Sequence, residues 1–255
     1  MNDWQEKEFK KIFIDDGLQN QFLQKGFCKI AFNYPDTTRK LIELFNKYWD
    51  NLPSTFAVSH FNPNFDSNKK ISNEILDAVS LEFELLLKDF KTIIGHFISK
   101  PPNYHQLVEL HRDWSYVEES KHLAIQLWIP LQNTDKKNGC LFVVPESQKD
   151  LNLRSVTYGI DLKPFESFSD RIIPIEVNIG EAICYHPGLL HGSFTNNTNS
   201  SRKAVLISLT HHDAPILYFN KPKSGITPEI EEISPDFFLA NHYSIQKEFD
   251  EKASA

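Results

Sequence analysis

Cysteine and glycine are both scarce in this chain, which has 3 cysteines and 9 glycines among its 255 residues. The cysteines, Cys28, Cys140 and Cys184, are irregularly spaced and each lies in an apolar run. An odd number at such spacing argues against a disulfide framework and against a zinc site. We therefore expect reduced, buried thiols in a cytoplasmic protein.

Long apolar runs and an excess of basic residues are also missing. No run of about 18 apolar residues occurs, which excludes a transmembrane helix. The first residues, 1–11, are charged and lack the apolar segment of a signal peptide. A formal net charge of -7 argues against nucleic acid as a partner. The composition, with 40% hydrophobic and 24% charged residues, is that of a soluble globular protein whose oligomeric state it does not determine.

The first hundred residues are mainly helical in pattern. Apolar spacing and the Pro and Gly signals predict helices over residues 3–16, 17–26, 35–50 and 72–99, and a strand over 27–32. Residues 51–70 are expected to be mainly loop, with a short strand near 56–61. His96 falls in the 72–99 segment and is interpreted as a packed helix residue rather than a ligand.

After Pro102 the pattern changes to short β-rich runs separated by turn residues. The expected strands are residues 104–113, 123–131, 140–144, 172–177, 182–185, 192–196 and 203–210. This spacing favours a sandwich or barrel over an α/β sheet. Residues 215–255 look helical in parts, with Thr227 and Ser234 each preceding a proline at a helix start. We predict a single domain over 1–255, with a helical part over 1–100, a β-barrel core over 103–212 and a tail over 213–255.

A candidate metal site begins at His111 and Asp113. Two residues apart on a strand, their side chains share one face. One further histidine would complete a 2-His-1-carboxylate set, which binds non-haem Fe(II). His191, which opens a later strand, is the favoured third ligand, and His186 is the competing alternative.

Two residues near His191 suggest a binding site for an organic acid. Ser193 shares the strand face of His191, and Arg202 begins the next strand. An arginine provides the bidentate fork that a buried carboxylate requires. A second His-x-Asp pattern, His211 with Asp213, has no arginine and no β-pattern after it, and we interpret it as the end of a strand.

These spaced motifs together resemble the phytanoyl-CoA dioxygenase family. The resemblance covers roughly residues 105–210 and includes the run from Asn138 to Ser147. It implies a mainly β fold with flanking helices and a double-stranded β-helix (jelly-roll, cupin-like) core. It also implies Fe(II), 2-oxoglutarate as co-substrate and O₂. The residues assigned by position are His111, Asp113 and His191 as iron ligands, Arg202 and Ser193 for the distal carboxylate of 2-oxoglutarate, and Trp128 and Gln126 for the walls of its pocket.

The resemblance predicts an oxygenase that hydroxylates an unactivated C–H bond of a small molecule, such as an amino acid, a natural-product intermediate or a lipid-like acid, and releases succinate and CO₂. Many members have glycine after Pro145, where this chain has Glu146, and we expect that turn to lie outside the site. Asp113 is retained, whereas halogenating relatives lack this carboxylate. Candidates for the substrate wall are Trp114, Tyr116, Tyr218 and Phe219. Two alternatives stay open, namely a non-catalytic metal- or ligand-binding barrel and a cupin dioxygenase that uses no keto-acid.

Overall fold

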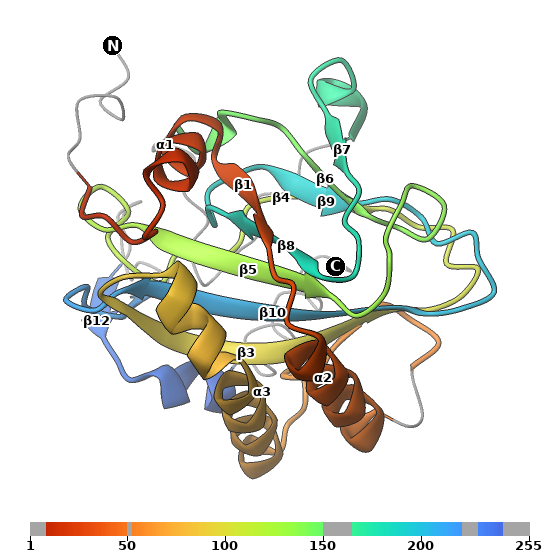
Figure 1. Cartoon of the computed structure of the whole chain (residues 1–255), viewed down its shortest axis with the longest axis horizontal. Helices are drawn as coiled ribbons and strands as arrows, with labels where there is room; N and C mark the ends of the chain where they lie inside the picture. Colours follow the sequence, from red (N-terminus) through yellow and green to blue (C-terminus); the bar gives the residue numbers. More distant parts are fainter. Residues whose placement is uncertain (1–8, 50–52, 150–164, 221–228, 242–255) are drawn as a thin grey trace.

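Two antiparallel sheets form the centre of the molecule in this computed structural model, which describes residues 9–49, 53–149, 165–220 and 229–241 (Figure 1). The larger, six-stranded sheet has the order β1-β8-β5-β10-β3-β2, and the smaller has the order β4-β9-β6-β7. The core is therefore the expected jelly roll with flanking helices. The bounds of the larger sheet's strands are β1 Phe27–Ala31, β2 Ala57–Val58, β3 Phe90–Lys100, β5 Ala124–Pro130, β8 Glu181–Tyr185 and β10 Arg202–His211. Those of the smaller sheet are β4 Val108–His111, β6 Leu141–Val143, β7 Ile173–Ile175 and β9 His191–Ser193.

The helices α1 (Asp16–Lys25), α2 (Pro35–Tyr48) and α3 (Phe65–Leu86) have recognisable signals at several of their ends. The Asp15 side chain accepts the backbone N–H of Leu18 at the start of α1, and Gly26 ends that helix in the left-handed region with φ 83°. Pro35 occupies the first turn of α2, where its missing N–H costs nothing. The predicted helices over 17–26 and 35–50 are confirmed. None of the described helices is both long and apolar enough to cross a membrane.

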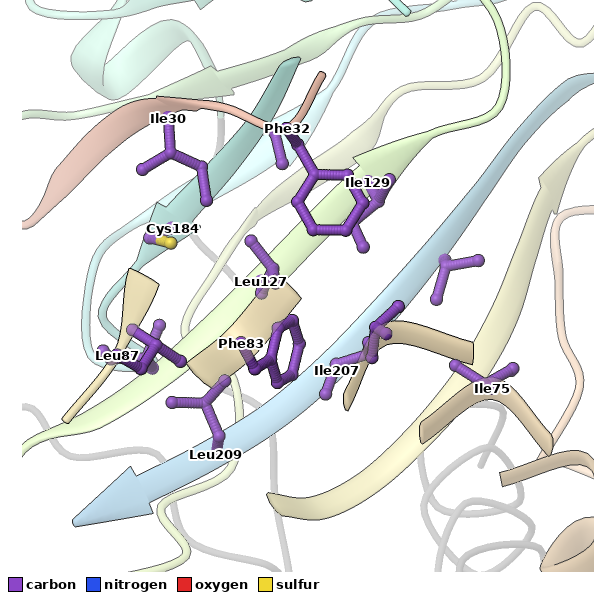
Figure 2. Packing of buried hydrophobic residues seen from close by; sticks show 14 of the residues in the cluster. Ile30, Phe32, Ile75, Phe83, Leu87, Leu127, Ile129, Cys184, Ile207 and Leu209 are labelled. Atoms are coloured by element: carbon purple, nitrogen blue, oxygen red, sulfur yellow. The ribbon is translucent and has the colours of Figure 1, made fainter. Parts of the chain in front are cut away.

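Because side chains alternate along each strand, one face of the larger sheet packs against the helices and the other faces the smaller sheet. Leu127 and Ile129 of β5 and Ile207 of β10 pack with α3 residues such as Phe83 in one apolar core (Figure 2). Successive strand side chains point to opposite faces, so Gln126 and Trp128 of β5 face the smaller sheet instead. The functional residues of this sheet therefore lie on the face that the helices leave open.

The predicted helix over 72–99 is wrong in its second half. The helix α3 ends at Leu86, Asp89 turns the chain with φ 48°, and residues 90–100 form β3. Most of β3 is buried on both faces, so its apolar residues show no period of two and its sequence cannot be distinguished from a buried helix. His96 is therefore a strand residue. The first hundred residues thus contribute β1, β2 and β3 to the larger sheet as well as helices.

The two ends of the described chain also differ from the sequence expectation. Residues 9–15 are not helical, and the rest of the predicted helix over 3–16 lies outside the described residues. Where helix was expected after Pro215, the chain first forms an antiparallel pair, β11 (Leu217–Asn220) with β12 (Glu229–Glu232). Residues 235–241 are helical and begin at the predicted Ser234-Pro235 signal. Thr227 falls outside the described ranges.

Candidate metal and co-substrate site

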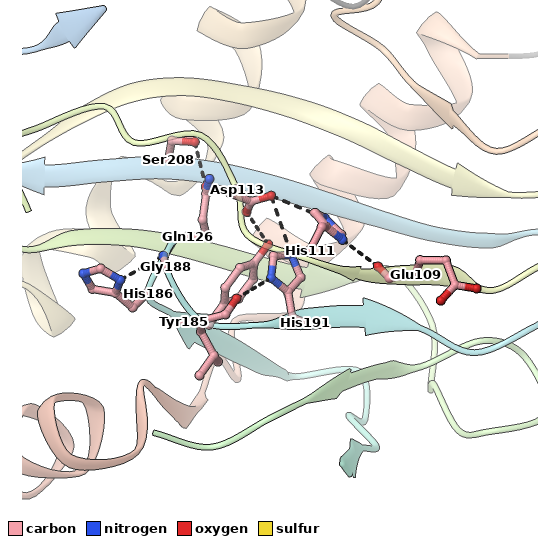
Figure 3. Close-up of polar contacts among 10 residues, drawn as sticks. Glu109, His111, Asp113, Gln126, Tyr185, His186, Gly188, His191 and Ser208 are labelled. Carbon is pink, nitrogen blue, oxygen red and sulfur yellow. Dashed lines mark hydrogen bonds and ion pairs between the residues drawn. The ribbon is translucent and has the colours of Figure 1, made fainter. Parts of the chain in front are cut away.

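The three predicted metal ligands converge where β4, an edge strand of the smaller sheet, meets its neighbour β9. His111 ends β4, His191 begins β9, and the two are directly opposite in the antiparallel register. Their ring centroids are 4.3 Å apart. The Nε2 atom of each lies 3.6 Å from Asp113 Oδ1 (Figure 3). One potential ligand atom from each residue lies within 4.8 Å of the others, the one such His/Cys/Asp/Glu group in the described part of the chain.

Hydrogen bonds orient all three side chains toward a common point. The Nδ1 of His111 is 2.8 Å from the Glu109 carbonyl oxygen, and the Nδ1 of His191 is 2.9 Å from that of Leu189. A carbonyl only accepts, so each Nδ1 carries the proton and each Nε2 presents its lone pair. The Tyr185 hydroxyl donates to Asp113 Oδ2 at 3.0 Å, which leaves Oδ1 for the shared point. Such outer contacts are typical of metal ligands.

The electrostatics of the group suit a divalent cation. Burial alone would raise the pKa of Asp113, but the neighbouring His191 and His111 and the Tyr185 hydroxyl outweigh it and bring the pKa to about 2. Burial lowers the pKa of His191 to about 4, so this imidazole is neutral near pH 7. Burial also acts to lower the pKa of His111, but its hydrogen bond to Asp113 leaves that pKa raised. The site therefore combines an ionised carboxylate with imidazole nitrogens, the donor set that binds Fe(II).

The metal-ligand group forms one wall of a cavity of about 310 Å³. The four residues assigned to the co-substrate, Arg202, Ser193, Trp128 and Gln126, all line this cavity as well. Ser193 follows His191 by two positions on β9, and the other three come from the inward face of β5 and β10. The structure thus brings all seven predicted site residues together.

Arg202 is a buried cation without an anionic partner in the described ranges. Its side chain is 1% exposed and lies over the Trp128 ring, with 5.5 Å between the guanidinium carbon and the ring centroid. Within those ranges its Nε and Nη1 atoms have no hydrogen-bond acceptor. Burial lowers the pKa of Arg202 to about 10, so it remains charged at neutral pH. An uncompensated buried charge is costly, which indicates a site built to receive an anion.

Sequence reasoning missed a second buried basic residue beside Arg202. Lys100 is opposite Arg202 in the β3–β10 register and is 0% exposed. Its ammonium donates to the carbonyl oxygens of Ser193 at 3.2 Å and Phe194 at 2.5 Å. Burial, followed by repulsion from Arg202, lowers its pKa to about 6. Only the sheet register reveals this neighbour, because the two residues are about one hundred positions apart in sequence.

Only one of the two parts suggested for the substrate wall lines the cavity. Trp114 and Tyr116 line the cavity. Tyr218 and Phe219 do not belong to the lining, and Tyr218 instead stacks on Phe237 with 4.7 Å between ring centroids.

The competing histidines do not join the metal-ligand group. His186 is buried away from it, and its Nδ1 accepts the backbone N–H of Gly188 at 2.9 Å. The decoy pair, His211 and Asp213, lies at the end of β10, where Asp213 forms an ion pair with Lys10 at 2.6 Å. The structure therefore favours His191 over both alternatives as the residue that completes the group.

The divergent turn after Pro145 lies outside the cavity lining, as predicted, but it supports the site. The Ser147 hydroxyl accepts the backbone N–H of Leu190 at 2.8 Å, next to His191. The Ser147 carbonyl also accepts from Arg112 Nη2 at 3.2 Å, next to His111. Glu146 has φ 69°, a conformation that favours glycine.

Comparison with known proteins agrees with this geometry. The family model of phytanoyl-CoA dioxygenase (PhyH) matches residues 54–204. Among curated proteins, phytanoyl-CoA dioxygenase of Arabidopsis thaliana is 30% identical over 122 residues, which cover 46% of this chain and 43% of the relative. Peroxisomal phytanoyl-CoA dioxygenase of Homo sapiens is 26% identical over 160 residues, covering 57% of this chain and 47% of the relative. The matched region thus spans about half of these relatives or less.

Solved structures with the same fold are more distant in sequence. EvdO2 from Micromonospora carbonacea var. aurantiaca, solved with 2-oxoglutarate, superposes with a TM-score of 0.53 at 16% identity, covering 86% of this chain and 97% of EvdO2. HygX from Streptomyces hygroscopicus, solved with nickel and 2-oxoglutarate, gives a TM-score of 0.59 at 11% identity, covering 85% of this chain and 98% of HygX. These similarities establish the fold alone. With the family match extending over more than half of its length, this chain belongs to the phytanoyl-CoA dioxygenase family.

Proposed function

We propose that this protein is an Fe(II)- and 2-oxoglutarate-dependent oxygenase that uses O₂ to hydroxylate a C–H bond of a small molecule, releasing succinate and CO₂. One observation carries the proposal: a 2-His-1-carboxylate group and a buried, unpaired arginine line the same cavity. A metal-binding scaffold would need no such arginine, nor would a cupin dioxygenase that uses no keto-acid. Family membership supports the same activity.

The metal would be held by the Nε2 atoms of His111 and His191 and by Oδ1 of Asp113. These three atoms are the ones that the surrounding hydrogen bonds leave available. Three protein ligands leave coordination positions open toward the cavity, as a non-haem iron oxygenase requires. When bound, the iron and its keto-acid would supply the oxidising power for C–H hydroxylation, with one oxygen atom of O₂ entering the product and the other entering succinate.

The protein's own contribution is to hold the co-substrate and exclude water. We assign the distal carboxylate of 2-oxoglutarate to the guanidinium of Arg202 and the hydroxyl of Ser193, with Trp128 as a wall. We assign Gln126 to the same pocket, where its Oε1 accepts the Ser208 hydroxyl at 2.7 Å. A dry, preorganised site of this kind strengthens electrostatic contacts and protects reactive species from side reactions.

The cavity limits the size of the substrate. Its volume of about 310 Å³ is near the lower end of the range for ligand pockets and must also hold 2-oxoglutarate. The cavity is also lined by apolar side chains from the segment that contains β2, namely Phe56, Val58 and Phe61. We therefore propose a compact, largely apolar substrate.

Spectroscopy of the anaerobic protein tests the proposal directly. Metal-free protein receives Fe(II) and then 2-oxoglutarate, and the weak visible charge-transfer band of the iron–keto-acid chelate is recorded. We expect the band in the wild type and in the control Asp213→Ala, and its loss in Asp113→Ala and His191→Ala. Iron binding without a band would support a cupin dioxygenase instead. Binding of neither component would leave a non-catalytic protein.

A further inference from the structure

Two histidines that the metal site does not use lie on the apolar wall of the same cavity. His96 on β3 is opposite Leu206 of β10, which is in turn opposite Trp128 of β5, and all three side chains line the cavity. His60 follows β2 and also lines it. The His60 and His96 rings are 4.1 Å apart between centroids, with an interplanar angle of 78°. An imidazole pair thus interrupts a surface that is otherwise mainly apolar.

His96 has the properties of a buried polar group whose hydrogen-bond partner would be a ligand. His96 is only 4% exposed. Neither of its ring nitrogens forms a hydrogen bond with any residue in the described ranges. Burial lowers the pKa of His96 to about 3, so the imidazole is neutral at physiological pH. Buried polar side chains are nearly always hydrogen-bonded, because leaving one unpaired is costly. A bound molecule that forms a hydrogen bond with His96 would offset this cost.

The pair is held rigidly in place. The Ser59 backbone N–H donates to the Phe97 carbonyl at 2.9 Å, and the Phe97 N–H donates to the Ser59 hydroxyl at 3.0 Å. These two bonds join the residues next to His60 and His96, so they hold the backbones that carry the two rings beside each other. A polar group fixed before binding loses little entropy when a ligand arrives.

The position of His96 separates it from the co-substrate's distal carboxylate. Lys100 is the last residue of β3 and is opposite Arg202. His96 is four residues earlier, about 13 Å along an extended strand. The distal carboxylate assigned to Arg202 is therefore remote from His96, which instead contacts His60 in the segment after β2.

We propose that His96, braced by His60, recognises a neutral oxygen of the primary substrate, a hydroxyl or a carbonyl, on a compact and largely apolar body. This inference rests on the proposed function and names the substrate class of that site. A neutral imidazole offers one donor and one acceptor, which match a hydroxyl or carbonyl oxygen. A charged group buried against the neutral imidazole of His96 would lack a counter-ion there, which makes a carboxylate or ammonium at this point unfavourable.

Fragment binding followed through the His96 ring tests this assignment. Zinc-substituted protein with 2-oxoglutarate bound is labelled with ¹⁵N-histidine, and the imidazole signals are followed during titration with cyclohexanol, cyclohexanone or cyclohexanecarboxylate. We expect the alcohol and the ketone to shift the His96 signals, and the carboxylate to bind more weakly. His96→Leu should weaken alcohol binding roughly three- to tenfold, and His96→Gln should restore part of it. The control His212→Leu, at an exposed position, should bind as the wild type does.

Each other outcome would overturn the assignment. A His96 shift produced by 2-oxoglutarate alone, with none from the fragments, would assign this imidazole to the co-substrate. Preference for the carboxylate, or equal alcohol binding by wild type and His96→Leu, would refute recognition of a neutral oxygen. Failure of the proposed function is distinguishable, because the iron–keto-acid band would then be missing from the wild type irrespective of any fragment.

Discussion

The buried lysine beside the co-substrate site should make the stability of the protein strongly dependent on pH. Lys100 has a pKa of about 6 in the folded protein, against an ordinary lysine pKa of 10.5, because of burial and then the charge of Arg202. Between these values the unfolded chain binds a proton at this position that the folded chain mostly does not. The free energy of unfolding should therefore rise with pH across this window.

The magnitude follows from proton linkage. One proton released on folding corresponds to at most about 1.4 kcal/mol per pH unit, so the upper limit between pH 7 and pH 9 is about 3 kcal/mol. The Lys100 ammonium donates to the carbonyls of Ser193 and Phe194, and these bonds favour the charged form and reduce the slope. Lys100→Met removes the titrating group while it preserves most of the side-chain volume.

Urea unfolding from pH 6.5 to 9.5 measures this effect. We expect the wild type to gain stability over Lys100→Met as pH rises, whatever the offset between them, since the variant also loses two hydrogen bonds. Lys203→Met provides a matched control, because the Lys203 ammonium contacts Asn46 at an exposed position on the same strand as Arg202. Parallel stability curves for wild type and Lys100→Met would refute the reasoning.

Three further substitutions probe the site. Arg202→Ala should weaken 2-oxoglutarate binding to metal-loaded protein by roughly 2–5 kcal/mol, measured by calorimetry, and an unchanged affinity would remove Arg202 from the co-substrate site. Tyr185→Phe removes the hydrogen bond to Asp113 Oδ2 and should weaken metal binding about 10- to 100-fold in a chelator competition. An unaltered metal affinity would contradict that role. Gly192→Ala would place a Cβ 2.3 Å from the Val108 carbonyl oxygen, so β4 and β9 must separate. We expect a loss of about 1–3 kcal/mol in thermal unfolding, together with weaker metal binding, whereas wild-type stability would show that the strands can adjust.

The sequence by itself predicted those features that depend on local spacing and on the order of motifs. The strands between Pro102 and His211, except for their exact ends, follow from alternation and turn residues, which short-range sterics determine. The grouping of His111, Asp113 and His191 in one cavity with Arg202 followed from their order within a recognisable set of motifs. Such features can be predicted because each one depends on a few neighbouring residues or on a shared ancestral pattern.

Other features were decided only by the tertiary structure. β3 reads as a helix because it is buried on both faces, by α3 on one side and the cavity on the other, which removes the period of two. That error concealed the His60–His96 pair and the position of Lys100 opposite Arg202. The contact of Tyr185 with Asp113 likewise joins residues 72 positions apart. Sheet order and register set these neighbours, and both arise from the packing of the whole chain rather than from any local run of residues.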